Sequence, residues 1–417
     1  MFKRKDTSSL TRTYEYKLRT NKKFVERAEQ VLDHCRFLYN CALEQRQSHY
    51  LYARKSLYYF DQQAELTTLR AEVPEMKAIG RTIQADVLRR LDKSFRAFFR
   101  RCQEKKKGLF KGKVGYPRFK GKNRYNSFAQ AIEPQRGCPL VGDKLTVPSM
   151  GTVRVRLHRP IEGTVKELRI LRRADGWYVQ LVCAVPKPAP LPLTGKTTGV
   201  DVNILNKITL SDGTVFPNHR FAKQNKKKLK QAQQQLARKV KGSANREKAR
   251  QKVALVHLHT SRCRRDDNHN VSTYLVNTFD ATFWEDLLVA NLTRNSKLAF
   301  HIQDVGWRQL RDLTQGKAAS AGREFGLRNP AWTSQTCSHC GFRQPMKLSE
   351  RVFKCERCHL VLPRDQNAAV NIEIGLGKPK LTPVERSSSA GGTVSTRKSA
   401  RRSRNRSEKH VETCHTT

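Results

Sequence analysis

Two Cys-x-x-Cys pairs are the residues of this chain whose spacing points most directly to chemistry. Cys337 and Cys340 form the first pair, Cys355 and Cys358 form the second, and 14 residues separate the pairs. Each pair can direct two thiolates at one ion, and the intervening loop can bring the second pair round to complete a tetrahedron. Four sulfur ligands favour Zn²⁺ and leave no open position, which predicts a structural zinc site. The alternatives are a pair of disulfides or four unrelated thiols.

Three acidic residues form a second candidate site. Asp201 lies in an apolar strand pattern, Glu285 ends the apolar run 281–284, and Asp365 begins an alanine-bearing helix soon after the second cysteine pair. Carboxylates on buried elements are costly unless they bind a cation or pair with a base. If the three converge, they could hold two Mg²⁺ ions ~4 Å apart and support phosphodiester hydrolysis. The alternative is a set of ordinary ion pairs with neighbouring lysine or arginine residues.

The charge of the chain predicts a polyanionic partner. Its 417 residues include 82 Lys and Arg against 36 Asp and Glu, which gives a formal charge of +46. Such a chain repels itself unless a polyanion neutralises it, and nucleic acid offers the many phosphates required. A membrane partner is disfavoured because no apolar run reaches the ~18 residues of a spanning helix. A ribosomal-type structural protein is also disfavoured, because such basic proteins are usually much smaller than this chain.

A basic loop is the candidate nucleic-acid contact. Eleven of the 25 residues 100–124 are Lys or Arg, and glycines and aromatic rings are interspersed among them. We expect the cations to contact phosphates and the rings to contact bases or sugars, although a run of charges can also be a solvated surface. The candidate residues are Arg36 in the preceding helix and Lys111, Lys113, Tyr116, Arg118, Phe119, Lys120, Lys122 and Arg124.

The first half of the chain has the pattern of a β-rich unit interrupted by helices. Strand patterns occur at residues 13–19 and across 141–185, where Asp175-Gly176 signals a hairpin. Between them, helical periodicity with an apolar stripe occurs at residues 21–46, 60–69 and 82–99, and Asn21 is the expected N-cap of the first helix. We therefore predict a small β-barrel interrupted by helices.

A proline-rich segment at 186–192 marks a domain boundary before the second half. The strand with Asp201 and a β-hairpin follow, then two basic helices at 221–240 and 245–277, and a buried strand that ends at Glu285. Together the two halves predict a multi-domain α+β protein.

Several of these motifs resemble the TnpB family of transposon-encoded, RNA-guided DNA nucleases, also called OrfB-type transposases and related to type V CRISPR effectors. The similarity rests on Gly199-Val200-Asp201 with T-L-S-D-G, on Glu285-Asp286-Leu287, and on the paired cysteines followed by R-D-Q-N-A-A-V-N-I. The segments C-R-F-L-Y-N-C-A-L-E, Y-P-R-F-K-G-K and T-S-Q-T-C are also similar, so the resemblance covers residues 14–375.

The resemblance implies a definite domain order. An N-terminal, wedge-like β-barrel would be interrupted by a helical recognition lobe, and a RuvC-type, RNase H-like α/β nuclease domain would carry the four-cysteine zinc ribbon as an insertion. The remaining tail is rich in Ser, Arg, Gly and Lys and is expected to be disordered and basic. The expected boundaries are 1–20 and 108–190 for the barrel, 21–107 for the lobe, 194–332 and 362–375 for the nuclease domain, 333–361 for the ribbon and 376–417 for the tail.

The resemblance also implies roles and partners. Asp201, Glu285 and Asp365 match the family's catalytic acids, which hold two Mg²⁺ ions, and the four cysteines match its structural Zn²⁺ ligands. The implied activity is Mg²⁺-dependent cleavage of double-stranded DNA, guided by an RNA transcribed from the transposon end and started at a short adjacent DNA motif. The expected location is the prokaryotic cytoplasm, in association with the nucleoid and without a membrane.

Two other functions stay open. The first is a cleavage-deficient, RNA-guided DNA-binding regulator of the same fold. Departures from the family pattern bear on it: Asn203 replaces a common Gly, Pro363 replaces a usual acid, and Asp267, Asn268 and Asn270 are polar replacements expected to weaken the packing of their helix. The second is a strand-transferring transposase with a D-D-E triad, which is disfavoured because here the middle acid is Glu and the last is Asp.

Overall fold

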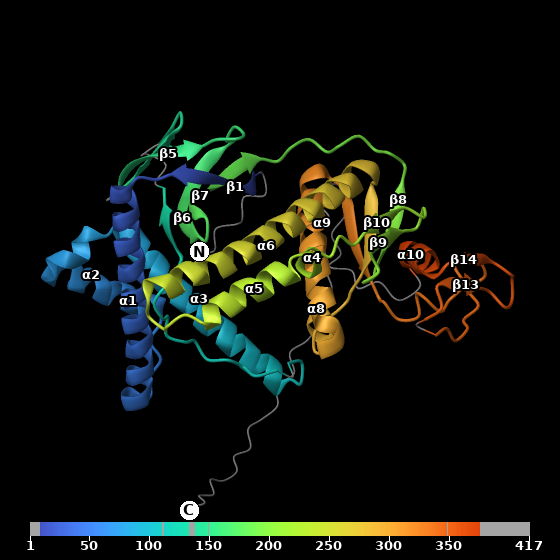
Figure 1. Cartoon of the computed structure of the whole chain (residues 1–417), viewed down its shortest axis with the longest axis horizontal. Helices are drawn as coiled ribbons and strands as arrows, with labels where there is room; N and C mark the ends of the chain where they lie inside the picture. Colours follow the sequence, from blue (N-terminus) through green and yellow to red (C-terminus); the bar gives the residue numbers. More distant parts are fainter. Residues whose placement is uncertain (1–8, 111, 133–137, 149, 348, 376–417) are drawn as a thin grey trace, which may run out of the picture.

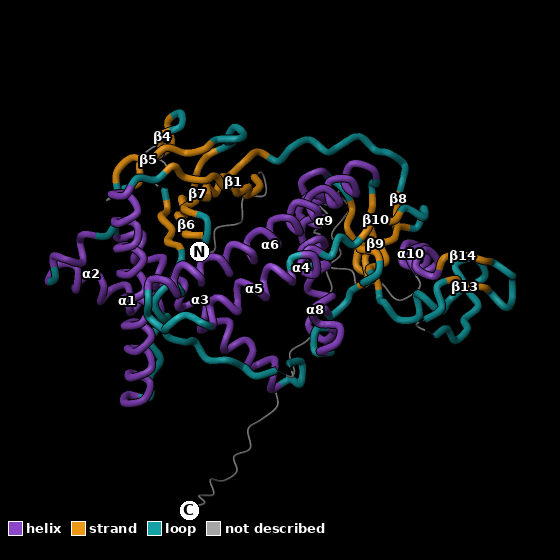
Figure 2. Tube along the Cα trace, in the orientation of Figure 1, coloured by secondary structure: helices purple, strands orange, loops and turns teal. Residues whose placement is uncertain are grey.

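The two larger β-sheets occupy separate regions of the molecule, and the long helix α6 (Ala244–Thr278) runs from one to the other (Figure 1). The computed structural model describes residues 9–375 apart from residues 111, 133–137, 149 and 348. The basic tail expected at 376–417 and the candidate Lys111 therefore lie outside the described residues. Strands and helices contribute to both regions (Figure 2), which confirms the α+β class predicted from the sequence.

The first sheet has seven antiparallel strands in the order β2-β6-β7-β1-β5-β4-β3. The predicted Asp175-Gly176 hairpin is confirmed, because β6 and β7 pair directly across this turn. No ladder joins the edge strands β2 and β3 within the described residues, so closure into the expected barrel stays a prediction. The strands are β1 (Ser9–Arg19), β2 (Ser127–Ala131), β3 (Leu140–Val141), β4 (Lys144–Val147), β5 (Gly151–Arg156), β6 (Thr164–Arg173) and β7 (Gly176–Pro186).

Helices are inserted between β1 and the other six strands of this sheet. The predicted cap of the first helix is confirmed, because Asn21 Oδ1 accepts a hydrogen bond from the backbone N–H of Phe24 at 2.8 Å. Apolar residues of helices and strands, such as Leu43, Leu91 and Phe128, share one core. The helices are α1 (Lys22–Ala53), α2 (Tyr59–Glu72), the 3₁₀ helix η1 (Pro74–Ala78) and α3 (Arg81–Lys106).

The second sheet is mixed and has the order β10-β9-β8-β11-β12. β8, β11 and β12 are parallel, whereas β9 and β10 form the antiparallel hairpin expected after Asp201. One face packs against α6 and α9 through a core that includes Val200, Leu275 and Leu310. The opposite face of β8 packs against α10 at Gly199. The strands are β8 (Thr197–Val202), β9 (Asn206–Leu210), β10 (Val215–Pro217), β11 (Ala281–Glu285) and β12 (Glu324–Arg328).

The helices of the second half differ in part from the expectation. The helix predicted at 221–240 is interrupted at Asn225, whose side-chain Nδ2 donates to the backbone oxygen of Phe221 and ends α4 there. Helices α7 to α9 and strand β12 were not predicted. The bounds are α4 (Phe221–Gln224), α5 (Lys226–Ala237), α7 (Val289–Leu292), α8 (Ser296–Val305) and α9 (Trp307–Ala321), and the C-terminal part has β13 (Val352–Lys354), β14 (Val361–Pro363) and α10 (Arg364–Ile374).

Specific contacts hold the two halves together. Arg262 of α6 donates to Asp175 at 2.8 Å and to the hydroxyl of Tyr178 at 2.6 Å, which joins this helix to the β6–β7 turn. The proline-rich segment is held as well, because Arg323 donates to the backbone oxygen of Pro192 at 2.8 Å. Within the described residues, no helix has the length and apolar character needed to cross a membrane.

Two of the three polar replacements in α6, Asp267 and Asn268, have partners in the folded chain. Asp267 forms an ion pair with Lys207, whose side chain is 2% exposed, and lies 3.6 Å from His219. Asn268 Nδ2 donates to Gln309 Oε1 at 2.9 Å. Asp267 therefore compensates a buried charge that β9 brings beneath the helix, which is a long-range contact that the helical pattern did not reveal.

Replacement of Asp267 by leucine is expected to destabilise the second half, because it leaves the buried ammonium group of Lys207 without its partner. We expect the free energy of unfolding to fall by about 2 kcal/mol, less than for a fully buried pair because Asp267 is partly exposed. Addition of Lys207→Met should recover most of this loss. Urea denaturation measures both effects, and a double variant as unstable as the single one would contradict the pairing.

Candidate functional site

The fold brings the three acidic residues to one edge of the second sheet. Asp201 lies in β8 and Glu285 ends β11, and these strands are parallel with Phe283 beside Gly199 and Trp284 beside Val200. This register places Glu285 beside Asp201 at the carboxyl edge of the two strands. Asp365 lies in the first turn of α10, which packs on β8. Residues 80 or more positions apart in the sequence are thus neighbours.

Burial and mutual repulsion shape the electrostatics of this group. Asp201 is 7% exposed, and burial, together with the charges of Glu285 and Asp365, raises its pKa well above the usual value. Burial raises the pKa of Glu285 to about 7, although a hydrogen bond from Thr333 opposes the shift. Repulsion among carboxylates that burial already disfavours makes this edge receptive to cations.

Two neighbours of the acids were not recognised as site residues in the sequence. Asn203 Nδ2 lies 3.1 Å from Asp365 Oδ2 and 3.4 Å from Asp201 Oδ2, and its Oδ1 accepts from the backbone N–H of Asn206 at 2.7 Å. Asn203 therefore bridges two of the acids, where the sequence suggested only an altered strand exit. Arg364 donates to Asp365 at 3.2 Å. Only a tertiary contact distinguishes Asn203 from other polar residues of the chain, whereas Arg364 bonds to its own sequence neighbour.

The spacing of the acids differs from that of the cysteines. In the described part of the chain, the four thiols are the one group of three or more potential ligands whose atoms all lie within 4.8 Å of one another. The three carboxylates form a looser group around Asp201. A single ion draws its ligand oxygens to within about 4 Å of one another, whereas a pair of ions spreads them further apart.

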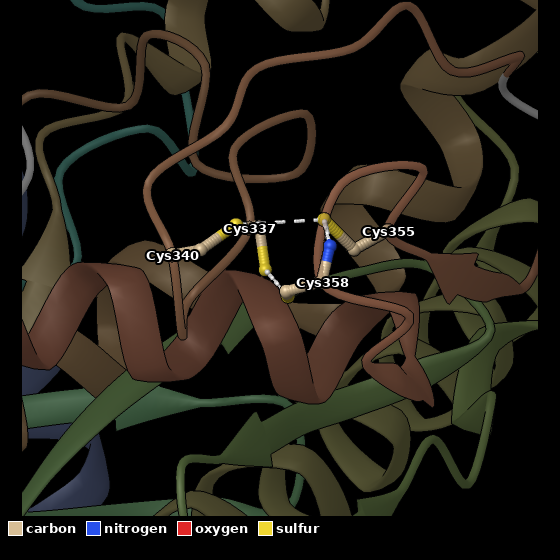
Figure 3. A group of neighbouring side chains, drawn as sticks. All are labelled: Cys337, Cys340, Cys355 and Cys358. Atoms are coloured by element: carbon tan, nitrogen blue, oxygen red, sulfur yellow. Dashed lines mark hydrogen bonds between the residues drawn. The ribbon is translucent and has the colours of Figure 1, made fainter.

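The four cysteines converge from two loops on one point (Figure 3). Cys337 Sγ lies 3.5 Å from Cys358 Sγ, and Cys340 Sγ lies 3.6 Å from Cys355 Sγ. These distances exceed the ~2.05 Å of a disulfide, and all four thiols are free. Burial opposes ionisation of Cys355, but hydrogen bonds from the backbone N–H groups of Cys358 and Arg357 outweigh it and lower the pKa to about 6. The group thus has the geometry of a metal site with four sulfur ligands.

Replacement of Cys355 by serine is expected to remove the metal from this site, because a hydroxyl replaces one of four soft ligands. The variant should lose close to one equivalent of zinc per chain and should unfold at a lower temperature. Elemental analysis and thermal unfolding measure the two effects. Cys263→Ser is the matched control, since this free thiol lies in α6, and equal zinc contents in the two variants would contradict the assignment.

The basic loop is mostly exposed, but its residues differ in their surroundings. Tyr116 packs edge-on against Phe95 and Phe98, so its ring also supports the helix α3. Lys120 is tied to α1, because Asn40 bonds to both its backbone N–H and its backbone oxygen. Arg36 pairs with Asp33 at 3.3 Å on the exposed surface of α1. The candidate side chains that lie exposed are Lys113, Tyr116, Arg118, Phe119, Lys122 and Arg124.

A cleft of 1380 Å³ separates the first sheet from helices α6 and α9. Seven Lys or Arg residues line it against three Asp or Glu residues, so its walls carry a positive excess. Lys17 and Arg156 belong to the sheet, whereas Arg265 and Lys317 belong to the helices. The sequence did not reveal this cleft, because its cations are dispersed along the chain.

Family models match three parts of the chain. Residues 180–296 match the OrfB_IS605 model, described as "Probable transposase", and residues 307–372 match the "Cas12f1-like, TNB domain". Residues 9–55 match a model of the same OrfB family described as "Helix-turn-helix domain". In this structure, residues 9–55 form the strand β1 and the single long helix α1.

Whole-chain comparisons agree with these matches. A protein of Streptomyces pristinaespiralis named "Putative RNA-guided DNA endonuclease" is 32% identical over 346 residues, covering 81% of this chain and 82% of the relative. "Putative RNA-guided DNA endonuclease InsQ" of Escherichia coli (strain K12) is 27% identical over 358 residues, covering 81% and 85%. The protein in the "Cryo-EM structure of the Cas12f1-sgRNA-target DNA complex" has a TM-score of 0.55 at 14% identity, over 88% of this chain and 99% of that one.

The fold is therefore of the Cas12f-like α+β class, with mixed and antiparallel sheets and a four-cysteine cluster beside the second sheet. Within that class, the chain belongs to the TnpB family of OrfB-type transposon proteins. This confirms the resemblance found in the sequence.

Proposed function

We propose that this protein is an RNA-guided, Mg²⁺-dependent DNA endonuclease encoded by a mobile element. The observation that carries the proposal is the meeting of Asp201, Glu285 and Asp365 at the carboxyl edge of β8 and β11. Relatives named as RNA-guided DNA endonucleases support the same activity. On this proposal, residues 194–332 and 362–375 form a RuvC-like nuclease domain, and residues 333–361 form the zinc ribbon.

The acidic group fits divalent cations better than it fits the alternative of ordinary ion pairs. Arg364 pairs with Asp365 and its charge also acts on Asp201, so the described contacts set one cation against three acids, while Asn203 and Thr333 bond to Asp201 and Glu285. Hard oxygen donors suit Mg²⁺, and the loose spacing of the three side chains suits two ions. Such ions would supply activation of the attacking water and stabilisation of the departing 3′ oxygen.

The protein's own residues would position the nucleic acids. The remainder of the fold is proposed as the barrel (1–20 and 108–190) and the helical recognition lobe (21–107), with the cation-lined cleft between the barrel and α6. One solved protein of this fold is bound in a Cas12f1-sgRNA-target DNA complex. We infer that the cleft and the loop 100–124 contact phosphates of a guide RNA from the transposon end and of target double-stranded DNA with a short adjacent motif.

The group of four cysteines is proposed to hold one structural Zn²⁺ ion. All four positions of a tetrahedron are filled by thiols, so no position is left for water or substrate. The ion would fold the ribbon rather than take part in the cleavage chemistry. The proposed location of the protein is the prokaryotic cytoplasm, in association with the nucleoid.

Purified protein with its co-purifying RNA tests the activity. The RNA is sequenced, and supercoiled plasmid carrying the matched target is incubated with and without Mg²⁺. A transcript from the gene's own flank and Mg²⁺-dependent cutting of the matched plasmid alone are the expected results. Magnesium is withheld rather than chelated, so that zinc stays bound. Binding of the matched plasmid without cutting would establish the regulator instead. Equal cutting of plasmids with and without the matched target would contradict RNA guidance.

A further inference from the structure

The hydroxyl of Thr333 lies against the acid that ends β11. Thr333 Oγ1 donates to Glu285 Oε1 at 2.9 Å, and Thr333 is 2% exposed. A hydrogen bond to one carboxylate oxygen fixes the plane of the carboxyl group and leaves the second oxygen for a cation. The nearest competing acceptor, the backbone oxygen of Pro330, is more distant at 3.3 Å. Glu285 is thus oriented by a residue from outside the second sheet.

The turn that presents Thr333 is unusual and firmly held. Trp332 has a φ of 70°, a region that bulky residues rarely adopt. Its backbone oxygen accepts from the N–H groups of Gln335 and Thr336, both at 3.0 Å, and the guanidinium group of Arg343 lies over its ring. Backbone strain of this kind persists where surrounding contacts enforce it, and it is typical of functional sites.

Two fully buried asparagines of α10 hold the same turn from the other side. Asn371 Nδ2 donates to the backbone oxygen of Thr333 at 2.8 Å. Asn367 Nδ2 donates to the backbone oxygen of Thr336 at 2.8 Å, and its Oδ1 accepts from the N–H of Ser338 at 2.9 Å. These asparagines are four residues apart on one face of the helix that begins with Asp365. The segment 333–338 therefore connects two of the three acids.

The four cysteines are connected both to the segment 333–338 and to the start of α10. Cys337 falls within the segment 333–338, and Cys358 lies just before β14, whose last residue Pro363 leads directly into α10. An ion bound by all four thiols would fix the distance between these two chain segments. Metal binding to the ribbon would therefore also hold the turn of Thr333 and the start of α10 in place.

We propose that Thr333 is a positioning residue for Glu285 and that the metal-loaded ribbon holds Thr333 in place. The inference rests on the proposed nuclease function. It extends that function by assigning the ribbon a role in positioning one of the three acids. The ribbon acts through hydrogen bonds and contributes no ligand to the catalytic ions.

Three variants test the positioning role. Thr333→Val removes the hydroxyl at nearly constant size, Thr333→Ser restores it, and Thr336→Val removes a hydroxyl of the same turn that bonds only to the Trp332 backbone oxygen among the described contacts. Binding of Mn²⁺ to the uncut complex is measured by electron paramagnetic resonance, and the Mg²⁺ concentration that gives half-maximal cutting is measured separately. We expect Thr333→Val to weaken both by about 10- to 100-fold, with wild-type behaviour in the other two variants.

The outcomes separate the two proposals. The Mn²⁺ bound by Asp201→Ala gives the background of the measurement, because this variant lacks one of the proposed ligands of the catalytic ions. If the wild type binds no more Mn²⁺ than Asp201→Ala, the nuclease proposal fails, and the positioning role with it. If the wild type binds and cuts but Thr333→Val matches it in both measurements, only the positioning role is overturned. Failure of Thr333→Ser to restore Mn²⁺ affinity would show a purely structural effect and would also overturn it.

A double-mutant cycle tests the link to the ribbon. Cys355→Ser should weaken Mn²⁺ binding as well as zinc binding, and Thr333→Val should then have little further effect in that background. Independent, additive losses would overturn the link. Should Cys355→Ser fail to fold, reversible removal of zinc from the wild type and from Thr333→Val gives the same comparison.

Discussion

Replacement of Asp201 by alanine is expected to abolish DNA cutting while leaving RNA binding and zinc content unchanged. The charges of Glu285 and Asp365 both act on Asp201, so its loss removes the proposed shared ligand of the metal pair. Metal stabilisation of the transition state contributes several kcal/mol, and each ~1.4 kcal/mol changes the rate tenfold. The cleavage rate should therefore fall by at least about a thousandfold. Single-turnover cutting of matched supercoiled plasmid measures it.

Folding should survive this change, because burial and repulsion already disfavour the carboxylate of Asp201. The matched control is Asp286→Asn, which removes the charge of the residue next to Glu285. Asp286 is paired with Arg311 at 3.9 Å and is not part of the acidic group. Its variant should cut at nearly the wild-type rate. Undiminished cutting by Asp201→Ala would end the catalytic assignment.

Replacement of Gly199 by alanine is expected to impair both cutting and stability. A Cβ atom at this position would lie 1.9 Å from the backbone oxygen of Ala369 and 2.6 Å from the backbone nitrogen of Glu373. Strand β8 and helix α10 would have to separate by about 1.5 Å to bring this distance to the 3.4 Å of an ordinary contact. These two elements carry Asp201 and Asp365, so the separation displaces the acids relative to each other.

Overpacking of this kind costs about 1–3 kcal/mol of folding free energy, and a displacement of about 1 Å in a catalytic group can cost about 100-fold in rate. Urea denaturation and single-turnover cutting measure the two losses. Gly80→Ala, just before α3, is the control, because a Cβ there has no neighbour within 4 Å and its φ of −56° is open to alanine. A Gly199→Ala protein that cuts like this control would show that the close approach of β8 and α10 is unimportant.

Features that depend on neighbouring residues were predicted well from the sequence. The four thiols that the structure brings together are the four that the two Cys-x-x-Cys pairs indicated. The cap at Asn21 and the hairpin at Asp175-Gly176 were also predicted correctly. Each of these features is determined within a few residues by backbone geometry or by ligand spacing, so a linear pattern is sufficient to reveal it.

Features that depend on distant partners were missed or misread. Asn203 was taken as a departure from a family pattern, yet it bonds to Asp365, 162 positions away. Asp267 was expected to loosen its helix, yet it pairs with the buried Lys207, 60 positions earlier. In both cases the side chain is polar because of a partner that the fold brings to it, and no local pattern identifies that partner.

By itself, the sequence determined the family of this protein, its four thiol ligands and the three acids that could share cations. Only the tertiary structure decided that parallel pairing of β8 and β11, with α10 packed at Gly199, places those acids at one edge. It also decided that Thr333 joins the ribbon to Glu285. The physical reason is that ligand spacing and strand periodicity are properties of a short stretch of chain, whereas convergence depends on which buried faces pack together.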